Sequence, residues 1–446
     1  MLEGRAAIAA AVHADLVDKL GRVRVLVGDD ARKACGMLPG PAGGPLAIAQ
    51  PANAEQVEAV VRIGKSRRAP VVPRSRLPAL YHEELRDALV LDCSALQAPP
   101  VIDVGRRAAT VGVGVPAALV DRMARQARLC LRSLPALDDG ARIGGLVAVG
   151  DPGDIGAGWG SLCHDVVGAE VVTGSGRLVQ LGAADLLGAA PWLGQGLGNA
   201  LGQVLGHEGR FGVVCSVTLR LHPAPDCAWA GSEVAADRDA VLRLGSLARR
   251  ALACHLVDTV LGVERAGRLR IDLRAVAWDP ADLPNASTRL VALCREHGLT
   301  LPKPVAEERR VRLGMQAGAW PQTVEHRASV DLLVAWPDLA NVLDVSQALY
   351  AEAGQAPDRT WTFGADGARV RCGIPVDGDG VLRAEAHPLI SRAGWLFDAG
   401  AIPVGAGSLL RAAVRERMPT AAKVLGAALQ RAWDAEGVLA GRTGVW

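Results

Sequence analysis

Between residues 45 and 127 the spacing of hydrophobic positions alternates between helical and strand-like patterns. Asn53, with Gln56 three residues later, resembles a helix capping box. The apolar residues that follow predict an amphipathic helix ending near residues 66–68: Val57, Val60, Val61 and Ile63. Pro116 fits the first turn of a second helix, which extends to about residue 127. Short apolar runs predict strands at 46–49, 69–73, 88–92 and 108–113.

The next patterned segment predicts a β-hairpin, because the apolar runs 170–173 and 177–181 are joined by a glycine-containing turn. Residues 210–221 alternate toward their end and stop just before Pro223. The resulting order places a helix among strands and ends in a hairpin. This order favours an α+β fold over a doubly wound parallel sheet.

After Pro225 the pattern predicts a second α+β domain, in which long helices separate apolar strands. The predicted helices are 237–256, 286–297 and 336–353, and the predicted strands are 269–276, 329–335 and 368–374. The chain therefore divides into an N-terminal helix and connector (1–44), a first domain (45–223), a second domain (224–410) and a C-terminal helix with a tail (411–446).

Composition narrows the function classes. The chain has 446 residues, 50% hydrophobic and 22% charged, with a net charge of +2, so nothing points to nucleic acid or an anionic membrane. The nine cysteines form no CxxC pair, which argues against a metal site, an iron–sulfur site or a disulfide framework. No apolar run predicts a transmembrane segment, and we expect a cytoplasmic protein.

Six segments in order resemble the FAD-linked oxidase family with a PCMH-type FAD-binding domain, which includes vanillyl-alcohol oxidases and D-lactate or glycolate dehydrogenases. These segments are 51–61, 71–74, 90–96, 110–115, 134–172 and 206–214, and the tail 434–442 resembles the family's C-terminal motif. The resemblance implies a two-subdomain FAD-binding fold, then an α+β cap or substrate domain, and a C-terminal helix that returns to the FAD-binding domain.

The resemblance also implies FAD as the cofactor and a set of residues that bind it. Those residues are Pro73, Arg74, Ser75, Arg76, Leu77, Pro135, Ile143, Gly144, Gly145, Gly150, Gly153, Gly160, Glu208, Gly209 and Val213. The glycines make chemical sense, because a pyrophosphate must approach backbone N–H groups that a Cβ would shield.

The sequence departs from the family at the first phosphate loop. No glycine lies between Gly64 and Gly105; Leu77 adds bulk there, and Pro78 removes a backbone donor. Some relatives attach flavin through a residue of this loop, and His82 is the only candidate for such a bond here.

A second departure concerns metal binding. Lactate-type relatives bind a divalent metal through two histidines, and Phe363 and Val370 stand at those positions here. We expect no metal. Asp366-Gly367 is instead typical of a hairpin turn between strands.

Two functions remain open. The first is an FAD-dependent oxidoreductase that oxidises a small oxygenated substrate such as a 2-hydroxy acid, with unknown catalytic residues. The second is a non-catalytic paralogous subunit of a glycolate or lactate dehydrogenase complex, packed against a flavin- or iron–sulfur-containing partner. The retained glycines favour the first, and the lost loop and histidines favour the second.

Overall fold

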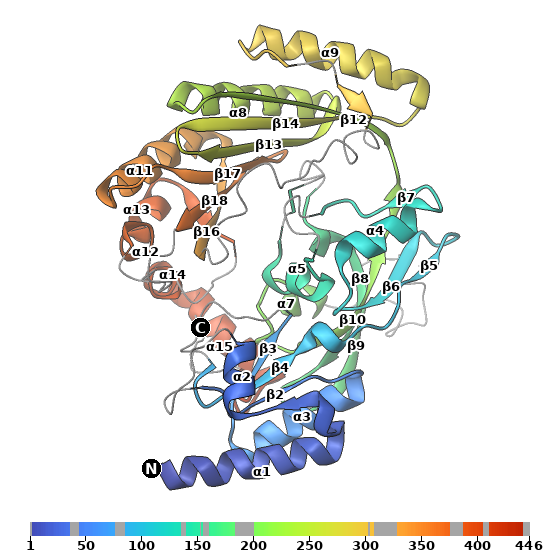
Figure 1. The fold of residues 1–446 in the computed structure, drawn as a ribbon, viewed down its shortest axis with the longest axis vertical. Helices are drawn as coiled ribbons and strands as arrows, with labels where there is room; N and C mark the ends of the chain where they lie inside the picture. Colours follow the sequence, from blue (N-terminus) through green and yellow to red (C-terminus); the bar gives the residue numbers. More distant parts are fainter. Residues whose placement is uncertain are drawn as a thin grey trace.

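The computed structural model shows two sheet-based halves stacked on each other (Figure 1). The structure describes residues 2–35, 44–75, 85–134, 140–151, 153–154, 160–182, 200–301, 304–306, 328–374, 387–404 and 410–439. No helix of these residues combines the length and the apolar character that a membrane span requires.

The lower half in Figure 1 begins with a four-stranded sheet in the order β1-β2-β4-β3, in which β2 and β3 both run parallel to β4. Its strands are β1 (Val25–Leu26), β2 (Ala47–Ala49), β3 (Val71–Arg74) and β4 (Leu89–Asp92). The helices of this part are α1 (Leu2–Leu20), α2 (Gly28–Ala34) and α3 (Ala54–Arg67). The predicted cap at the start of α3 is confirmed, since Gln56 N donates to Asn53 Oδ1 at 2.9 Å; the Gln56 side chain reaches back to Ala52 N–H rather than to that of Asn53.

A five-stranded antiparallel sheet in the order β5-β6-β10-β8-β9 follows. Its strands are β5 (Val101–Asp103), β6 (Ala108–Gly112), β8 (Val166–Val172), β9 (Leu178–Gly182) and β10 (Val213–Arg220). The short pair β7 (Leu129–Cys130) and β11 (His222–Pro223) lies beside helix α4 (Ala117–Arg125). Helices α5 (Ile143–Val149) and α7 (Ala200–Val204) also belong to this half. Buried and half-buried residues alternate along β10, as its hydrophobic pattern predicts, and the predicted hairpin is β8–β9.

The upper half is built on an eight-stranded sheet in the order β15-β12-β14-β13-β17-β18-β16-β19. Its strands are β12 (Asp226–Ala235), β13 (Val257–Arg265), β14 (Arg268–Ala277), β15 (Val305–Ala306), β16 (Ala328–Ala335), β17 (Asp358–Phe363), β18 (Gly367–Ile374) and β19 (Ala401–Pro403). Its helices are α8 (Arg238–Ala253), α9 (Leu283–Glu296), α11 (Leu339–Glu352), α12 (Pro388–Ser391), α13 (Ala393–Asp398) and α14 (Arg411–Arg417).

The two faces of this sheet differ in chemistry. Alternate residues of β18, such as Val370 and Cys372, are buried in the apolar core that α8, α9 and α11 complete. Arg369 and Arg371, which alternate with these apolar residues, therefore point to the opposite face. Figure 1 shows that α8 and α9 lie on the side of the sheet away from the lower half. The charged face is thus turned toward the lower half.

The C-terminal helix α15 (Thr420–Trp433) returns to the lower half, as the resemblance implies. Asp434 ends this helix and accepts the N–H groups of Val438 and Leu439, which are buried in the lower core. Val438 O also accepts Val71 N–H at 2.8 Å, which joins the tail to β3. These contacts give the C-terminal motif a structural role.

The structure adds elements that the hydrophobic pattern did not predict. The segment before residue 45 supplies β1 and α2 besides its predicted helix, and β1 pairs with β2 in the first sheet. Strands β12, β13 and β17 were not predicted either. The predicted turn at Asp366-Gly367 is confirmed: it joins β17 to β18, and Gly364 N donates to Gly367 O at 2.8 Å.

Candidate functional site

Three separate segments that the sequence predicts as a phosphate cradle meet in the lower half. Ser75 directly follows β3, and a Cβ added to Gly145 in α5 would lie 2.6 Å from Oγ of Ser75. In the same way, a Cβ on Gly209 would lie 2.5 Å from Cγ of Pro73. The fold therefore brings the end of β3, the start of α5 and the turn before β10 into contact.

The two adjacent glycines of α5 have different environments. Gly144 N donates to Val113 O at 2.8 Å, and a Cβ on Gly144 would lie 2.9 Å from Cβ of Val113. Close packing against Val113, the residue that follows β6, thus explains why Gly144 carries no side chain. Among the described residues, the Gly145 N–H and the Ser75 hydroxyl have no hydrogen-bond partner. Gly145 therefore offers what a bound phosphate needs, an unshielded and unused backbone donor.

The other predicted cofactor residues divide into several groups. Ile143 and Val213 are fully buried in the apolar core, and Arg74 is the last residue of β3. Left-handed backbone occurs at five of the predicted positions, which are Gly150, Gly153, Gly160, Glu208 and Gly209. Arg76, Leu77 and Pro135 lie outside the described residues, and so does His82.

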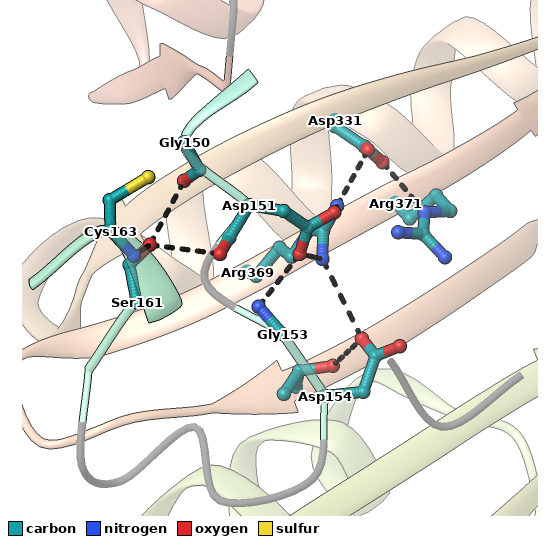
Figure 2. A network of polar contacts seen from close by, with 10 residues as sticks. Gly150, Asp151, Gly153, Asp154, Ser161, Cys163, Asp331, Arg369 and Arg371 are labelled. Carbon is teal, nitrogen blue, oxygen red and sulfur yellow. Dashed lines mark hydrogen bonds and ion pairs between the residues drawn. The ribbon is translucent and has the colours of Figure 1, made fainter. Parts of the chain in front are cut away.

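Next to this cradle, the two halves of the molecule are joined by a buried ion network (Figure 2). Nη1 and Nη2 of Arg369, in β18, lie 2.7 and 3.0 Å from the two carboxylate oxygens of Asp151, two residues after α5. Asp154 Oδ1 accepts the hydroxyl of Thr362 in β17 at 2.9 Å and lies 3.7 Å from Nη1 of Arg369. Only 4% of the Arg369 side chain is exposed, so these charges meet largely out of water.

The network continues along the charged face of the upper sheet. Asp331 in β16 lies between two arginines, 2.9 Å from Nη2 of Arg369 and 2.9 Å from Nε of Arg371. Burial opposes ionisation of Asp331, but Arg371 and then Arg369 outweigh it and lower the pKa of this carboxyl. Although burial opposes the charged form, the carboxylates around Arg369 raise its pKa above the usual value, Asp331 most strongly. Asp331 and Arg369 are therefore charged at neutral pH.

The segment after Gly160 supports this network from the other side. The Ser161 hydroxyl lies 2.9 Å from Asp151 O and 3.4 Å from Gly150 O, and it accepts Cys163 N–H. Figure 2 shows these contacts beside the Asp151–Arg369 pair. Burial raises the pKa of the Cys163 thiol to about 11, so it is not a nucleophile at neutral pH. Ser161 and Cys163 thus hold the backbone in place.

The sequence profile of a family described as FAD binding domain matches residues 45–182. A D-2-hydroxyglutarate dehydrogenase from Xanthomonas citri pv. viticola is 32% identical over 183 residues, 41% of this chain and 38% of that protein. A D-lactate dehydrogenase from Archaeoglobus fulgidus is 24% identical over 178 residues, 40% of this chain and 38% of that protein. Residues 45–182 belong to the FAD-binding domain family. The chain aligns with about two fifths of the length of these relatives.

Solved structures extend the likeness in fold beyond the FAD-binding domain. A 4-ethylphenol oxidase from Gulosibacter chungangensis superposes with a TM-score of 0.76 at 16% identity, covering 99% of this chain and 98% of that one. A p-cresol methylhydroxylase superposes with a TM-score of 0.76 at 13% identity, covering 97% and 96%. Because both superpositions cover nearly the whole chain, the upper half of the molecule shares the fold of these two enzymes as well.

The described residues fit FAD at two places. At the cradle, the FAD-binding domain offers the unused Gly145 N–H and the Ser75 hydroxyl to a pyrophosphate. At the junction, Nε of Arg369 is buried without a hydrogen-bond partner among the described residues. A buried donor without an acceptor costs about 1–3 kcal/mol, and an acceptor on a bound group would remove that cost.

In the part of the chain that the structure describes, no three His, Cys, Asp or Glu side chains are grouped in a way that could hold a metal ion. Phe363 and Val370, at the positions of the family's metal histidines, are fully buried in the core on the helix side of the upper sheet.

The sequence prediction missed all the junction residues, which are Asp151, Asp154, Asp331, Thr362, Arg369 and Arg371. One signal was available, because arginine alternates with apolar residues from Ala368 to Cys372. Such alternation predicts one apolar and one charged strand face. Nothing in the sequence, however, identifies Asp151 and Asp154 as the partners across the junction.

Proposed function

We propose that this chain is an FAD-dependent oxidoreductase that oxidises a small 2-hydroxy acid, and that Arg371 binds the substrate carboxylate. The FAD-binding domain and the two-domain fold support the cofactor and the reaction type. The printed names of two relatives, D-2-hydroxyglutarate dehydrogenase and D-lactate dehydrogenase, support the 2-hydroxy acid class.

The observation that carries the substrate class is the position of the Arg371 guanidinium. Asp331 accepts its Nε–H, and among the described residues neither Nη nitrogen has a partner. Figure 2 shows these two nitrogens pointing away from Asp331. A guanidinium oriented through Nε and open at Nη is suited to a carboxylate, which it can bind with two parallel hydrogen bonds.

Bound FAD would supply the hydride acceptor. The contribution of the chain is to hold the acid beside it. Arg371 would fix the carboxylate, and the charged, largely buried face of the upper sheet would keep bulk water from the hydroxyl-bearing carbon. Asp331, which lies between the two arginines, would keep both guanidinium groups oriented before the substrate arrives.

The test is anaerobic reduction of the FAD-loaded full chain, and the loss of flavin absorbance measures the reduction. The probes are glycolate, D-lactate and D-2-hydroxyglutarate, with propane-1,2-diol as an uncharged control. We expect at least one acid to reduce the flavin and the diol not to. Arg371→Met should raise the concentration for half-maximal reduction roughly 10–100-fold, the value of a charge-assisted hydrogen-bonded pair, and Arg371→Lys should recover part of it. Equal reduction by acid and diol, or an unchanged Arg371→Met variant, would contradict the proposal.

A second function, a non-catalytic subunit beside a flavin- or iron–sulfur-containing paralogue, is favoured by a different observation. Phe363 and Val370 are apolar core residues at the positions where relatives hold metal ligands. If none of the acids reduces the loaded chain, and the chain co-purifies with such a partner when both are expressed, this second function replaces the first.

A further inference from the structure

We propose that Arg369 is a positioning residue that links the FAD-binding domain to the substrate-binding face of the upper sheet. This inference rests on the proposed function, because it takes Arg371 as the substrate-binding residue. It goes beyond that function by assigning Arg369 a role through its carboxylate partners, separate from any contact of its Nε with the cofactor. Its evidence is the set of contacts in Figure 2.

On the side of the FAD-binding domain, Arg369 holds the backbone through Asp151. The Asp151 carboxylate accepts both Nη groups of Arg369 and also the N–H of Gly153 at 2.7 Å. Asp151 N donates in turn to Leu146 O of α5 at 2.9 Å. One guanidinium therefore orders the backbone that directly follows α5.

Helix α5 carries this constraint to the cradle. Gly145 and Val149, the last residue of α5, are four positions apart, about 6 Å along the helix axis, and Asp151 follows two residues later. The end of α5 near Asp151 is fixed by Arg369, and the other end presents the unused Gly145 N–H beside Ser75. Displacing Asp151 would therefore displace the phosphate donor.

On the substrate side, Arg369 acts through Asp331. This carboxylate accepts from Nη2 of Arg369 with Oδ2 and from Nε of Arg371 with Oδ1. Removing the Arg369 guanidinium would leave Asp331 paired with Arg371 alone and free to turn. Arg369 thus contacts Asp151 on the side of the FAD-binding domain and Asp331 on the side of the proposed substrate. If it couples cofactor binding to substrate binding, the coupling must act in both directions.

A buried ion network is weak evidence for stability, because desolvation offsets much of the attraction between the charges. Such networks are better explained where they fix one geometry among several, and Arg369 spans two domains. A bidentate guanidinium is also more restrictive than an ammonium. Arg369→Lys should therefore keep the charge and lose much of the positioning.

The experiment measures hydrogen exchange of the ligand-free full chain, in the peptide that contains Gly150, Asp151 and Gly153. Arg369→Met should raise its exchange rate about tenfold or more. Asp151→Asn should do the same, and the double variant should add little, because both changes remove one interaction. Arg359→Met is the matched control, since Arg359 is a buried arginine of the neighbouring strand with partners inside its own domain. That variant should leave this peptide unchanged while the protein is folded.

FAD affinity and substrate affinity are then measured on the same variants. Arg369→Met should weaken both, with FAD binding falling about tenfold or more, and Arg369→Lys should lie between it and the unchanged protein. Unchanged exchange in Arg369→Met, or loss of only one of the two affinities, would overturn the inference. If the unchanged chain binds FAD but no acid reduces it, the proposed function fails, and the exchange and FAD measurements still decide the role of Arg369.

Discussion

Two buried arginines on neighbouring strands of the upper sheet, Arg359 in β17 and Arg369 in β18, have opposite surroundings. Arg359 faces the helices, and its Nε and Nη2 lie 2.8 Å from the two oxygens of Glu264, while its Nη1 donates to the Ser346 hydroxyl at 2.7 Å. Arg369 faces the FAD-binding domain, pairs with Asp151 across the junction and has a buried Nε without a partner among the described residues.

The difference shows that burial and charge alone do not identify a functional arginine. The exposed fractions of the two side chains are 2% and 4%, and each has a bidentate carboxylate partner. All three guanidinium nitrogens of Arg359 donate hydrogen bonds within one domain, as those of a structural arginine should. Arg369 keeps an unused donor and joins segments of two domains, as a group that serves a bound ligand should.

The largest effect is expected at the structural arginine. Arg359→Met would leave the Glu264 carboxylate buried without its guanidinium partner, which should cost about 3–5 kcal/mol of folding free energy. Urea denaturation followed by circular dichroism measures this cost. A loss below about 1 kcal/mol would show that Arg359 is not the structural counterpart that the comparison assumes.

An intermediate effect is expected at the two glycines of α5. Gly144→Ala should destabilise the fold by about 1–3 kcal/mol, because its Cβ would meet Cβ of Val113 at 2.9 Å. Gly145→Ala should cost less stability, since the Ser75 hydroxyl can rotate away, but it should weaken FAD binding by at least tenfold. Denaturation and FAD titration of both variants test this pair, and the reverse pattern would remove Gly145 from the cofactor site.

A smaller effect is expected at the other contact across the junction. Thr362→Val removes the hydroxyl that donates to Asp154 at 2.9 Å and should cost about 1–2 kcal/mol. The change keeps the shape of the side chain, so the loss reports the hydrogen bond rather than packing. A neutral result in urea denaturation would mean that Asp154 is held by its other contacts alone.

The smallest effect is a pH dependence from Asp331. Its folded pKa is lowered by Arg371 and Arg369, so its contribution to stability is present above the unfolded value of about 3.9 and is lost as the pH falls through the folded one. The stability difference between the unchanged protein and Asp331→Asn should therefore shrink below about pH 4. Urea midpoints between pH 3 and pH 7 measure it, and a difference that grows in acid would contradict the sign.

Much of the fold was predictable because it depends on local patterns. The helix after Asn53, the β8–β9 hairpin and the turn at Gly367 follow from capping, turn and spacing rules that act within a few residues. Strands β12, β13 and β17 were missed because they interrupt the apolar pattern with charged or small residues, as Asp258 and Gly262 do in β13. Such residues become favourable in a strand only when a partner from another part of the chain covers them.

The site was predictable to a lesser degree, for the same reason. The cradle glycines follow from a motif, and the fold brings Pro73, Ser75, Gly145 and Gly209 together. The pair Asp151–Arg369 joins residues more than 200 positions apart, and no local pattern specifies such a contact. That the cradle residues bind FAD stays a prediction, as do the contributions of Arg76 and Leu77.

Titration of FAD into the purified full chain, stripped of bound flavin and checked for folding by circular dichroism, tests the account most directly. We expect saturable binding of one FAD per chain, at least tenfold weaker in both Gly145→Ala and Arg369→Met than in the unchanged protein. A folded chain that takes up no FAD, or that binds it equally well in all three forms, would contradict it.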